Sequence, residues 1–213
     1  MPRISFIESI RQAQYEELAR DPTVFLMGED LVANVFGTTT GLIEEFGTER
    51  IRDTPLSENG FVGAAAGASM VGARPIVDLT ITSFVYVAMD QICSIIAKSK
   101  YIYGGQVKLP LVLRMCMFYG NSNAAQHSDR NYPMFMGMPG LKIIIPSTPY
   151  DMKVEDNIIH DLFADLVKAN TDSKTPSVLS RNVPSTIFFL HLSSGESLSF
   201  VANQSGNHPQ VLG

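Results

Sequence analysis

Several features common in other protein classes are scarce or missing in this 213-residue sequence. There are only two cysteines, Cys93 and Cys116, far apart and in apolar surroundings, so neither a disulfide framework nor a CxxC metal or redox site is indicated. No stretch approaches the ~18 consecutive apolar residues that a membrane span needs. Basic residues (16) are fewer than acidic ones (21), which argues against a protein that binds the nucleic-acid backbone. These absences favour a folded protein of a reducing, intracellular compartment.

Common catalytic signatures are also lacking. The sequence contains no GxxxxGK[ST] phosphate loop, no HExxH, no GxSxG and no cluster of histidines at metal-ligand spacing. An unrelated nucleotide-binding domain would need a glycine-rich phosphate loop after its first strand, and Gly28-Glu29-Asp30 is a poor candidate for one. The four histidines of this chain are scattered along the sequence.

Short apolar segments alternate with amphipathic ones over the first 150 residues. A helix is predicted from Phe6 to Leu18, because Ser5 and Glu8 form a capping-box pattern ahead of helical spacing. Further helices are predicted over 41–46, 61–71 and 85–96, and strands over 24–27, 51–54, 75–79, 111–115 and 142–146. This alternation predicts an α/β fold, doubly wound, with a mainly parallel sheet and helices on both faces.

The composition changes near residue 153. All ten methionines and thirteen of the sixteen glycines precede Val154. We therefore divide the chain into a domain over 1–153 and a divergent tail over 154–213, with a helix over 154–166, a possible strand over 186–190 and a poorly ordered end.

Three polar or aromatic residues stand out as candidates for chemistry. Glu58 lies between a predicted strand and a helix of small residues, where it either caps that helix or is a semi-buried carboxylate at a ligand-binding edge. Phe84 is either a core aromatic or a platform for a ligand. His127 lies in the long loop predicted over 117–139, where an imidazole is either simply exposed or able to transfer protons near neutral pH.

Residues 1 to about 153 resemble the first domain of the beta subunit of thiamine-diphosphate-dependent 2-oxo-acid dehydrogenases, the group that includes the pyruvate, branched-chain and acetoin enzymes. The order and spacing of the matching stretches are specific. They are 24–30, 53–58 (Asp-Thr-Pro-Leu-Ser-Glu), 60–75, 88–91 (Ala-Met-Asp-Gln), 104–106 (Gly-Gly-Gln), 125–128 (Ala-Gln-His-Ser), 139–142 and 146–151. The resemblance implies a transketolase-like pyrimidine-binding domain.

The resemblance also implies roles for the candidate residues. Glu58 matches the glutamate that hydrogen-bonds the pyrimidine ring nitrogen of thiamine diphosphate and promotes loss of the thiazolium carbon proton. Phe84 matches the aromatic residue beside the pyrimidine. His127 matches a histidine near the substrate and the incoming lipoyl group, where it handles protons or stabilises an intermediate.

The implied function is that of an oxidoreductase subunit for oxidative decarboxylation of a 2-oxo acid, or cleavage of acetoin, with acyl transfer to lipoyl. The diphosphate-and-magnesium motif of thiamine enzymes does not occur here; in the family it belongs to a separate alpha subunit, so this chain is expected to be active only with that partner. A lipoyl-bearing acyltransferase is a further expected partner. A bacterial cytoplasm is favoured over a mitochondrial matrix.

Gly63 and Gly67 lie four residues apart in the small-residue segment. This spacing permits close helix packing, either within the chain or against a second beta subunit, as in family members. Beyond Lys153 the family's Arg-Asp-Asp-Asn-Pro turn, part of a potassium site in several members, is not recognisable. The family's C-terminal domain is expected to be absent, so the alternative is a truncated, catalytically inactive beta-like protein that acts as an interaction module.

Overall fold

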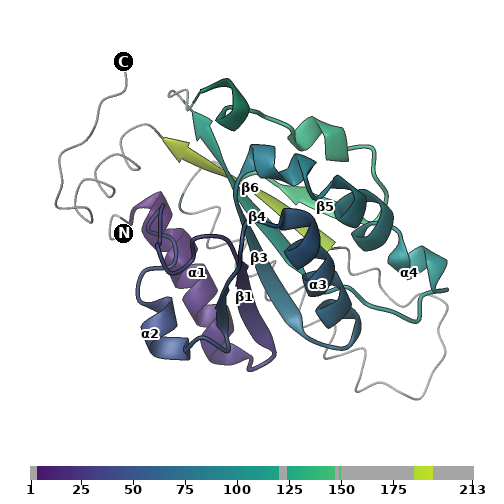
Figure 1. The fold of residues 1–213 in the computed structure, drawn as a ribbon, viewed down its shortest axis with the longest axis horizontal. Helices are drawn as coiled ribbons and strands as arrows, with labels where there is room; N and C mark the ends of the chain where they lie inside the picture. Colours follow the sequence, from purple (N-terminus) through teal and green to yellow (C-terminus); the bar gives the residue numbers. More distant parts are fainter. Residues whose placement is uncertain (1–3, 120–123, 147–148, 150–184, 194–213) are drawn as a thin grey trace.

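The structure, a computed structural model, describes residues 4–119, 124–146, 149 and 185–193 (Figure 1). Six strands in this part of the chain form one sheet in the order β2-β1-β3-β4-β6-β5, and every neighbouring pair is parallel. The strands are β1 Val24–Gly28, β2 Ile51–Asp53, β3 Arg74–Ile81, β4 Val112–Tyr119, β5 Leu141–Ile144 and β6 Ser185–Ser193. The predicted parallel α/β sheet is confirmed.

Helices lie on both sides of this sheet, with α1 and α2 on one side and α3 on the other (Figure 1). The α-helices are α1 Phe6–Arg20, α2 Leu42–Phe46, α3 Glu58–Met70 and α4 Ser99–Ile102. The described residues also contain three short 3-10 helices and one π-helix: η1 Thr82–Tyr86, η3 Ala125–His127, η4 Tyr132–Phe135 and the π-helix η2 Gln91–Ile96. None of the described helices has the length and apolar character needed to cross a membrane.

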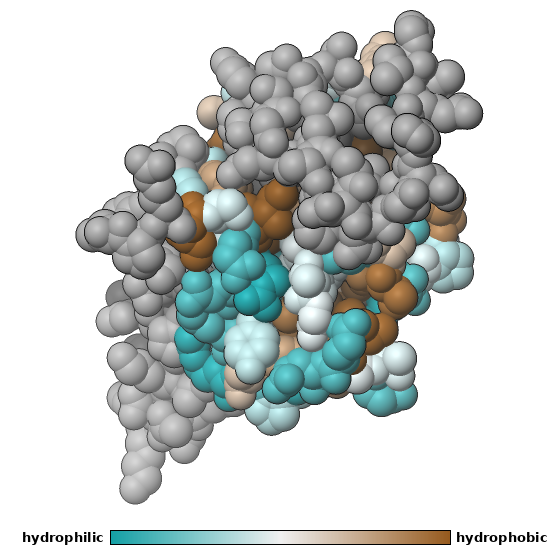
Figure 2. All heavy atoms as spheres, turned by 90° about the vertical axis from the view of Figure 1, so that its left-hand side faces the viewer, coloured by the Kyte–Doolittle hydropathy of each residue, from teal (hydrophilic) through white to brown (hydrophobic). Residues whose placement is uncertain are grey.

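Helix α1 begins at Phe6, as the sequence predicts. Ser5 takes its expected part in the capping box, but the Glu8 side chain pairs with Arg11 instead. The Glu8 amide donates to the Ser5 hydroxyl at 3.1 Å, so Ser5 is the N-cap. The Glu8 carboxylate pairs with Arg11 at 2.7 Å. Figure 2 views the molecule from this side and shows mainly hydrophilic side chains with smaller hydrophobic patches between them. On α1 itself Arg20 is exposed, whereas Arg11, Gln12 and Glu16 are half-buried.

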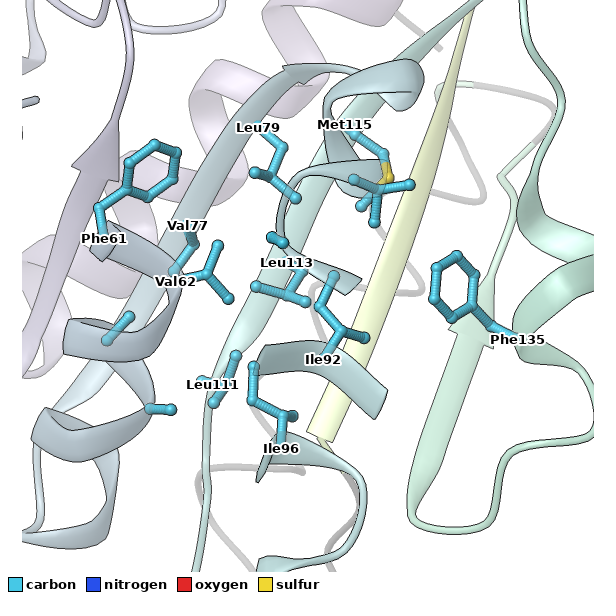
Figure 3. Close-up of a cluster of buried hydrophobic side chains, with 14 of the residues drawn as sticks. Phe61, Val62, Val77, Leu79, Ile92, Ile96, Leu111, Leu113, Met115 and Phe135 are labelled. Atoms are coloured by element: carbon cyan, nitrogen blue, oxygen red, sulfur yellow. The ribbon is translucent and has the colours of Figure 1, made fainter. Parts of the chain in front are cut away.

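The largest apolar cluster lies between α3, η2 and one face of the sheet (Figure 3). Val77 and Leu79 of β3 face this cluster, whereas Ile76 faces the cluster on the α1 side. This alternation is what a strand buried on both faces requires. The core therefore fixes β3 in the centre of the molecule.

A β-bulge interrupts β3 just before its carboxyl end. Asp78 is opposite Arg114 and Ile81 is opposite Cys116, so β3 has one residue more than β4 over this span. Thr80 takes the left-handed conformation (φ 59°), which is unfavourable for a β-branched residue. The extra residue turns Ile81 to the α1 side, where it packs with Cys116.

Two predictions about elements need correction. The segment predicted as one α-helix over 85–96 begins in the 3-10 helix η1, continues through a turn at 87–88 and two α-helical residues at 89–90, and ends as the π-helix η2. Val85, Ala88, Ile92 and Ile96 face the core as expected. The loop predicted from residue 117 begins later, because β4 continues to Tyr119. The residues of the helix predicted over 154–166 lie outside the described residues.

The strand predicted over 186–190 is present as β6. It pairs with β4 on one side and with β5 on the other. A strand from the segment that composition sets apart as a tail thus lies inside the same sheet as the strands of 1–153.

Candidate functional site

The candidate site lies at the carboxyl edge of the sheet, where ligands of open parallel sheets bind. Three neighbouring strands end there and lead directly into polar segments. Glu29 follows β1, Glu58 begins α3 shortly after β2, and η1 follows β3. The strand order therefore brings together residues that are far apart in the sequence.

Glu58 is the first residue of α3 and only 8% exposed. Helix α3 begins here because Ser57 takes a non-helical conformation and the residues that follow are small and helix-compatible. A carboxylate in the first turn is stabilised by the partial positive charge of the helix N-terminus. The structure thus combines both interpretations of Glu58: it stands at the helix start, and it is sequestered from solvent.

Glu29 is a second buried carboxyl group beside Glu58, and the sequence analysis did not single it out. It is 3% exposed, and its Oε1 atom has no hydrogen-bond partner among the described residues. Burial raises the pKa of Glu29 to about 7, with further contributions from the negative charges of Glu58, Asp30 and Asp78. Glu29 can therefore hold or release a proton near neutral pH. The sequence feature that could have identified Glu29 is its position directly after a predicted buried strand.

A small pocket, open to solvent and with a cavity volume of about 10 Å³, lies next to Glu29. Its polar lining includes Asp30, Thr38, Asp78 and Thr80. The Thr80 hydroxyl is buried and has no hydrogen-bond partner among the described residues. Because two of its buried polar atoms lack partners among the described residues and its volume is close to that needed by one water molecule, the pocket is suited to a single water.

Asp78 and Arg114 form a buried ion pair across β3 and β4, on the same side of the sheet as this pocket. They are opposite each other in the strand register, and Arg114 Nη2 lies 2.8 Å from Asp78 Oδ2. Arg114 also donates to the Thr38 hydroxyl, at the pocket wall. Burial raises the pKa of Asp78, against the lowering effects of Arg114 and of the Thr80 amide. The sequence analysis missed this pair.

Phe84 and His127 lie against each other at the same edge. Their ring centroids are 5.3 Å apart and their planes meet at 87°, an edge-to-face contact. Both side chains are half-buried. His127 Nδ1 lies 3.1 Å from the Gln126 carbonyl oxygen, which can only accept, so Nδ1 carries the hydrogen and Nε2 is left as the acceptor in the neutral ring.

The structure thus brings the predicted residues into two pairs, Phe84 with His127 and Glu58 with the unpredicted Glu29. Among the described residues no group of three potential ligands could hold a metal ion. Both cysteines are free, and burial raises the pKa of the Cys116 thiol to about 12, which makes it unreactive as a nucleophile.

The two glycines of α3 have different surroundings. A Cβ on Gly63 would lie 2.9 Å from Oε1 of Gln91 in η2, so Gly63 serves close packing within the chain. A Cβ on Gly67 would meet nothing within 4 Å. Ala64 and Gly67 of α3 and Val71, its C-cap, form an exposed strip without any charge, called here the exposed strip of α3.

This fold and this edge define the class of protein. Residues 3–155 match the family described as the transketolase pyrimidine binding domain, and the chain belongs to that family. A solved structure described as "Split gene transketolase, inactive beta4 tetramer" has the same fold, with a TM-score of 0.61 over 90% of this chain and 52% of that one, at 17% identity.

Proteins of higher sequence identity to this chain are beta subunits of dehydrogenases and of an acetoin oxidoreductase. The beta subunit of acetoin:2,6-dichlorophenolindophenol oxidoreductase from Cupriavidus necator is 42% identical over 71% of this chain and 48% of its own. The 2-oxoisovalerate dehydrogenase beta subunit of Bacillus subtilis is 42% identical over 72% and 47%, respectively. The pyruvate dehydrogenase E1 beta subunit of Rickettsia bellii is 40% identical over 71% and 47%. The chain spans about half the length of these relatives.

Proposed function

We propose that this chain is a beta-type oxidoreductase subunit that supplies the aminopyrimidine side of a thiamine diphosphate site, for oxidative decarboxylation of a 2-oxo acid or for cleavage of acetoin. The observation that supports this most is the buried pair of carboxyl groups, Glu58 and Glu29, at the carboxyl edge of the sheet. The beta subunits that resemble this chain belong to enzymes acting on acetoin, 2-oxoisovalerate and pyruvate.

The residues present fit such a cofactor. A ring nitrogen needs a carboxyl group that is sheltered from water and able to share a proton, and Glu58 is sheltered at the start of α3. The unpartnered Oε1 of Glu29 and its pKa of about 7 support a role for Glu29 as a second group that holds an exchangeable proton in the same site. When bound, thiamine diphosphate supplies the nucleophilic carbon that attacks the carbonyl group of the substrate.

The other two predicted residues fit roles around the same ligand. Phe84 offers an aromatic ring as a wall beside the pyrimidine. His127, with Nε2 as the acceptor in its neutral form, is suited to hold or deliver a proton near the substrate and the lipoyl group. The catalytic residues of this proposal are therefore Glu58 and His127, and the residues that hold the cofactor are Glu58 and Phe84.

The proposal includes partners. An alpha subunit would hold the diphosphate and its magnesium ion, and a lipoyl-bearing acyltransferase would accept the acyl group. The exposed strip of α3 at Gly67 would pack against a second beta subunit. We further propose the bacterial cytoplasm as the location and residues 1–153 as the pyrimidine-binding unit, with 154–213 as a divergent segment that contributes β6.

The test combines the purified chain with the alpha subunit of one of these relatives, thiamine diphosphate and magnesium. Turnover is followed as reduction of 2,6-dichlorophenolindophenol with acetoin, pyruvate or 2-oxoisovalerate. We expect Glu58→Gln to lower kcat about 100-fold or more, because the amide keeps the size of the side chain but cannot share the proton. Glu44→Gln, at an exposed position of α2, is the matched control and should retain wild-type turnover.

A second candidate is a catalytically inactive beta-like interaction module. If the wild-type chain assembles with alpha subunits and remains inert with all three substrates, this second candidate replaces the first.

A further inference from the structure

The segment that bears His127 is closed on itself by local hydrogen bonds. The Ser128 hydroxyl donates to the Ala124 carbonyl at 2.6 Å, across the short helix η3. Ala124 itself takes the left-handed conformation (φ 60°), which is costly for a residue with a Cβ atom. The turn therefore has a defined shape, but these contacts do not by themselves place it against the sheet.

Two further hydrogen bonds attach this turn to η1. The Thr82 hydroxyl donates to the Asp129 carbonyl at 3.0 Å, and the Asn131 side-chain amide donates to the Thr82 carbonyl at 2.6 Å. Thr82 is 0% exposed and Asn131 is 4% exposed. Thr82 thus donates one hydrogen bond to the turn and accepts another from it. Because Thr82 and Asn131 are buried, water does not compete for these bonds.

The positions of these bonds relate them to the candidate site. Thr82 is two residues before Phe84, and Asp129 is two residues after His127. The Thr82–Asp129 bond therefore lies within two residues of the edge-to-face contact between Phe84 and His127 on both sides, and the Asn131 bond joins the same Thr82 to a residue four positions after His127. Losing either bond would free the turn to move away from η1, and with it the imidazole.

We propose that Thr82 and Asn131 act as positioning residues that hold the His127 imidazole against Phe84 at the carboxyl edge of the sheet. This inference concerns the geometry of the chain itself; only its catalytic consequence rests on the proposed function. A displacement of a catalytic group by about 1 Å is enough to lower the reaction rate about 100-fold. The hydrogen bonds of Thr82 and Asn131 can therefore affect turnover although neither residue touches the ligand.

The first test measures geometry in the full chain by NMR, with labelled histidine and phenylalanine. In the wild type we expect nuclear Overhauser contacts between the rings of Phe84 and His127, and a His127 signal shifted by the aromatic ring. Thr82→Val keeps the shape but removes the hydroxyl donor, and should abolish these contacts. Thr82→Ser keeps the hydroxyl and should restore them. Persistence of the contacts in Thr82→Val would overturn the proposal.

Asn131→Leu is the second variant and should have the same effect through the other bond. Thr23→Val is the matched control, because Thr23 donates to Asp21 just before β1 begins, at the opposite end of that strand from Glu29, and it should leave the His127 signal unchanged. If Thr82→Val does not fold, Thr82→Ala and Asn131→Leu decide the question by the same signals.

The second test measures turnover with an alpha subunit, as above. We expect Thr82→Val to lower kcat about 10-fold or more with little change in the substrate KM, and Thr82→Ser to recover activity to within about twofold. Lower kcat in Thr82→Val without rescue by Thr82→Ser contradicts a role of the hydroxyl. If the wild type shows no turnover, the proposed function fails, whereas the NMR test still decides the positioning.

Discussion

At the scale of single residues, two buried carboxyl groups of different character lie at the same edge of the sheet, near enough for the charge of Glu58 to raise the pKa of Glu29. The Glu58 carboxylate is stabilised by the partial positive charge at the N-terminus of α3. Glu29 instead follows β1, and its Oε1 atom has no hydrogen-bond partner among the described residues. Its pKa of about 7 results first from burial and then from neighbouring negative charges. Pairs of acids whose surroundings differ in this way are typical of sites that move protons.

Glu29→Gln tests this difference through stability. Because the pKa of Glu29 is raised from 4.5 to about 7 on folding, the folded state binds more protons than the unfolded state between these values, and the free energy of unfolding falls as pH rises. Above pH 7 the penalty is complete, on the order of 1–3 kcal/mol. Denaturant unfolding at pH 4.5, 6 and 8 should show this loss in the wild type and a flatter profile in Glu29→Gln.

The control for this prediction is Glu44→Gln, at an exposed position, which should keep the slope of the wild type. Parallel profiles for the wild type and Glu29→Gln would show that Glu29 ionises in the folded protein as it does in the unfolded chain.

The sequence alone identifies candidate residues whose distinguishing signal lies in their immediate sequence neighbours. Glu58, Phe84 and His127 are recognisable because each stands in a distinctive stretch of neighbours. Asp78 and Arg114 are not, because each is an isolated charge between apolar neighbours and its partner is 36 positions away. Only the register of β3 and β4 places the two charges opposite each other. Glu29 is intermediate, because its position after a strand is visible but its proximity to Glu58 is not.

At the scale of elements, the Asp78–Arg114 pair ties the two central strands together just before the bulge in β3. Arg114→Met would leave the Asp78 carboxylate buried without its cation, and should destabilise the protein by about 3–5 kcal/mol. Adding Asp78→Val replaces the pair by apolar side chains and should recover most of this loss. Denaturant unfolding of both single variants and the double variant measures the coupling.

Arg11→Met serves as the control for this cycle, because the Arg11–Glu8 pair is on the surface and should cost only about 0.5 kcal/mol. A double variant that is as unstable as the sum of the two single ones would contradict the predicted coupling.

The boundaries of helices and strands were predictable where a local capping or chain-breaking residue marks them. They were not predictable where packing against the rest of the molecule determines the backbone conformation. The starts of α1 and β1 follow from Ser5 and from the Asp21-Pro22 break. The segment after β3 has the spacing of an α-helix, but its β-branched residues Thr82, Val85 and Val87 disfavour that conformation. The bonds of Thr82 to the His127 turn add a constraint that the spacing does not reveal.

At the scale of the whole molecule, the sheet is completed by a strand from far along the chain. β6 pairs with both β4 and β5, so residues 185–193 separate two strands that are neighbours in the sequence. The order β4-β6-β5 could not be read from the sequence, because the strand signal over 186–190 carries no information about its place in the sheet.

The exposed strip of α3 gives a test of assembly that separates folding from association. Because a Cβ on Gly67 would meet nothing within 4 Å, Gly67→Leu should stabilise the isolated chain by about 0.8 kcal/mol through helix propensity. The same side chain would keep a second helix from approaching closely, so it should weaken self-association about 10-fold or more in sedimentation velocity. Ala19→Leu, at an exposed position of α1, should leave association unchanged. A variant that gains stability and associates like the wild type would show that α3 is not the contact between beta subunits.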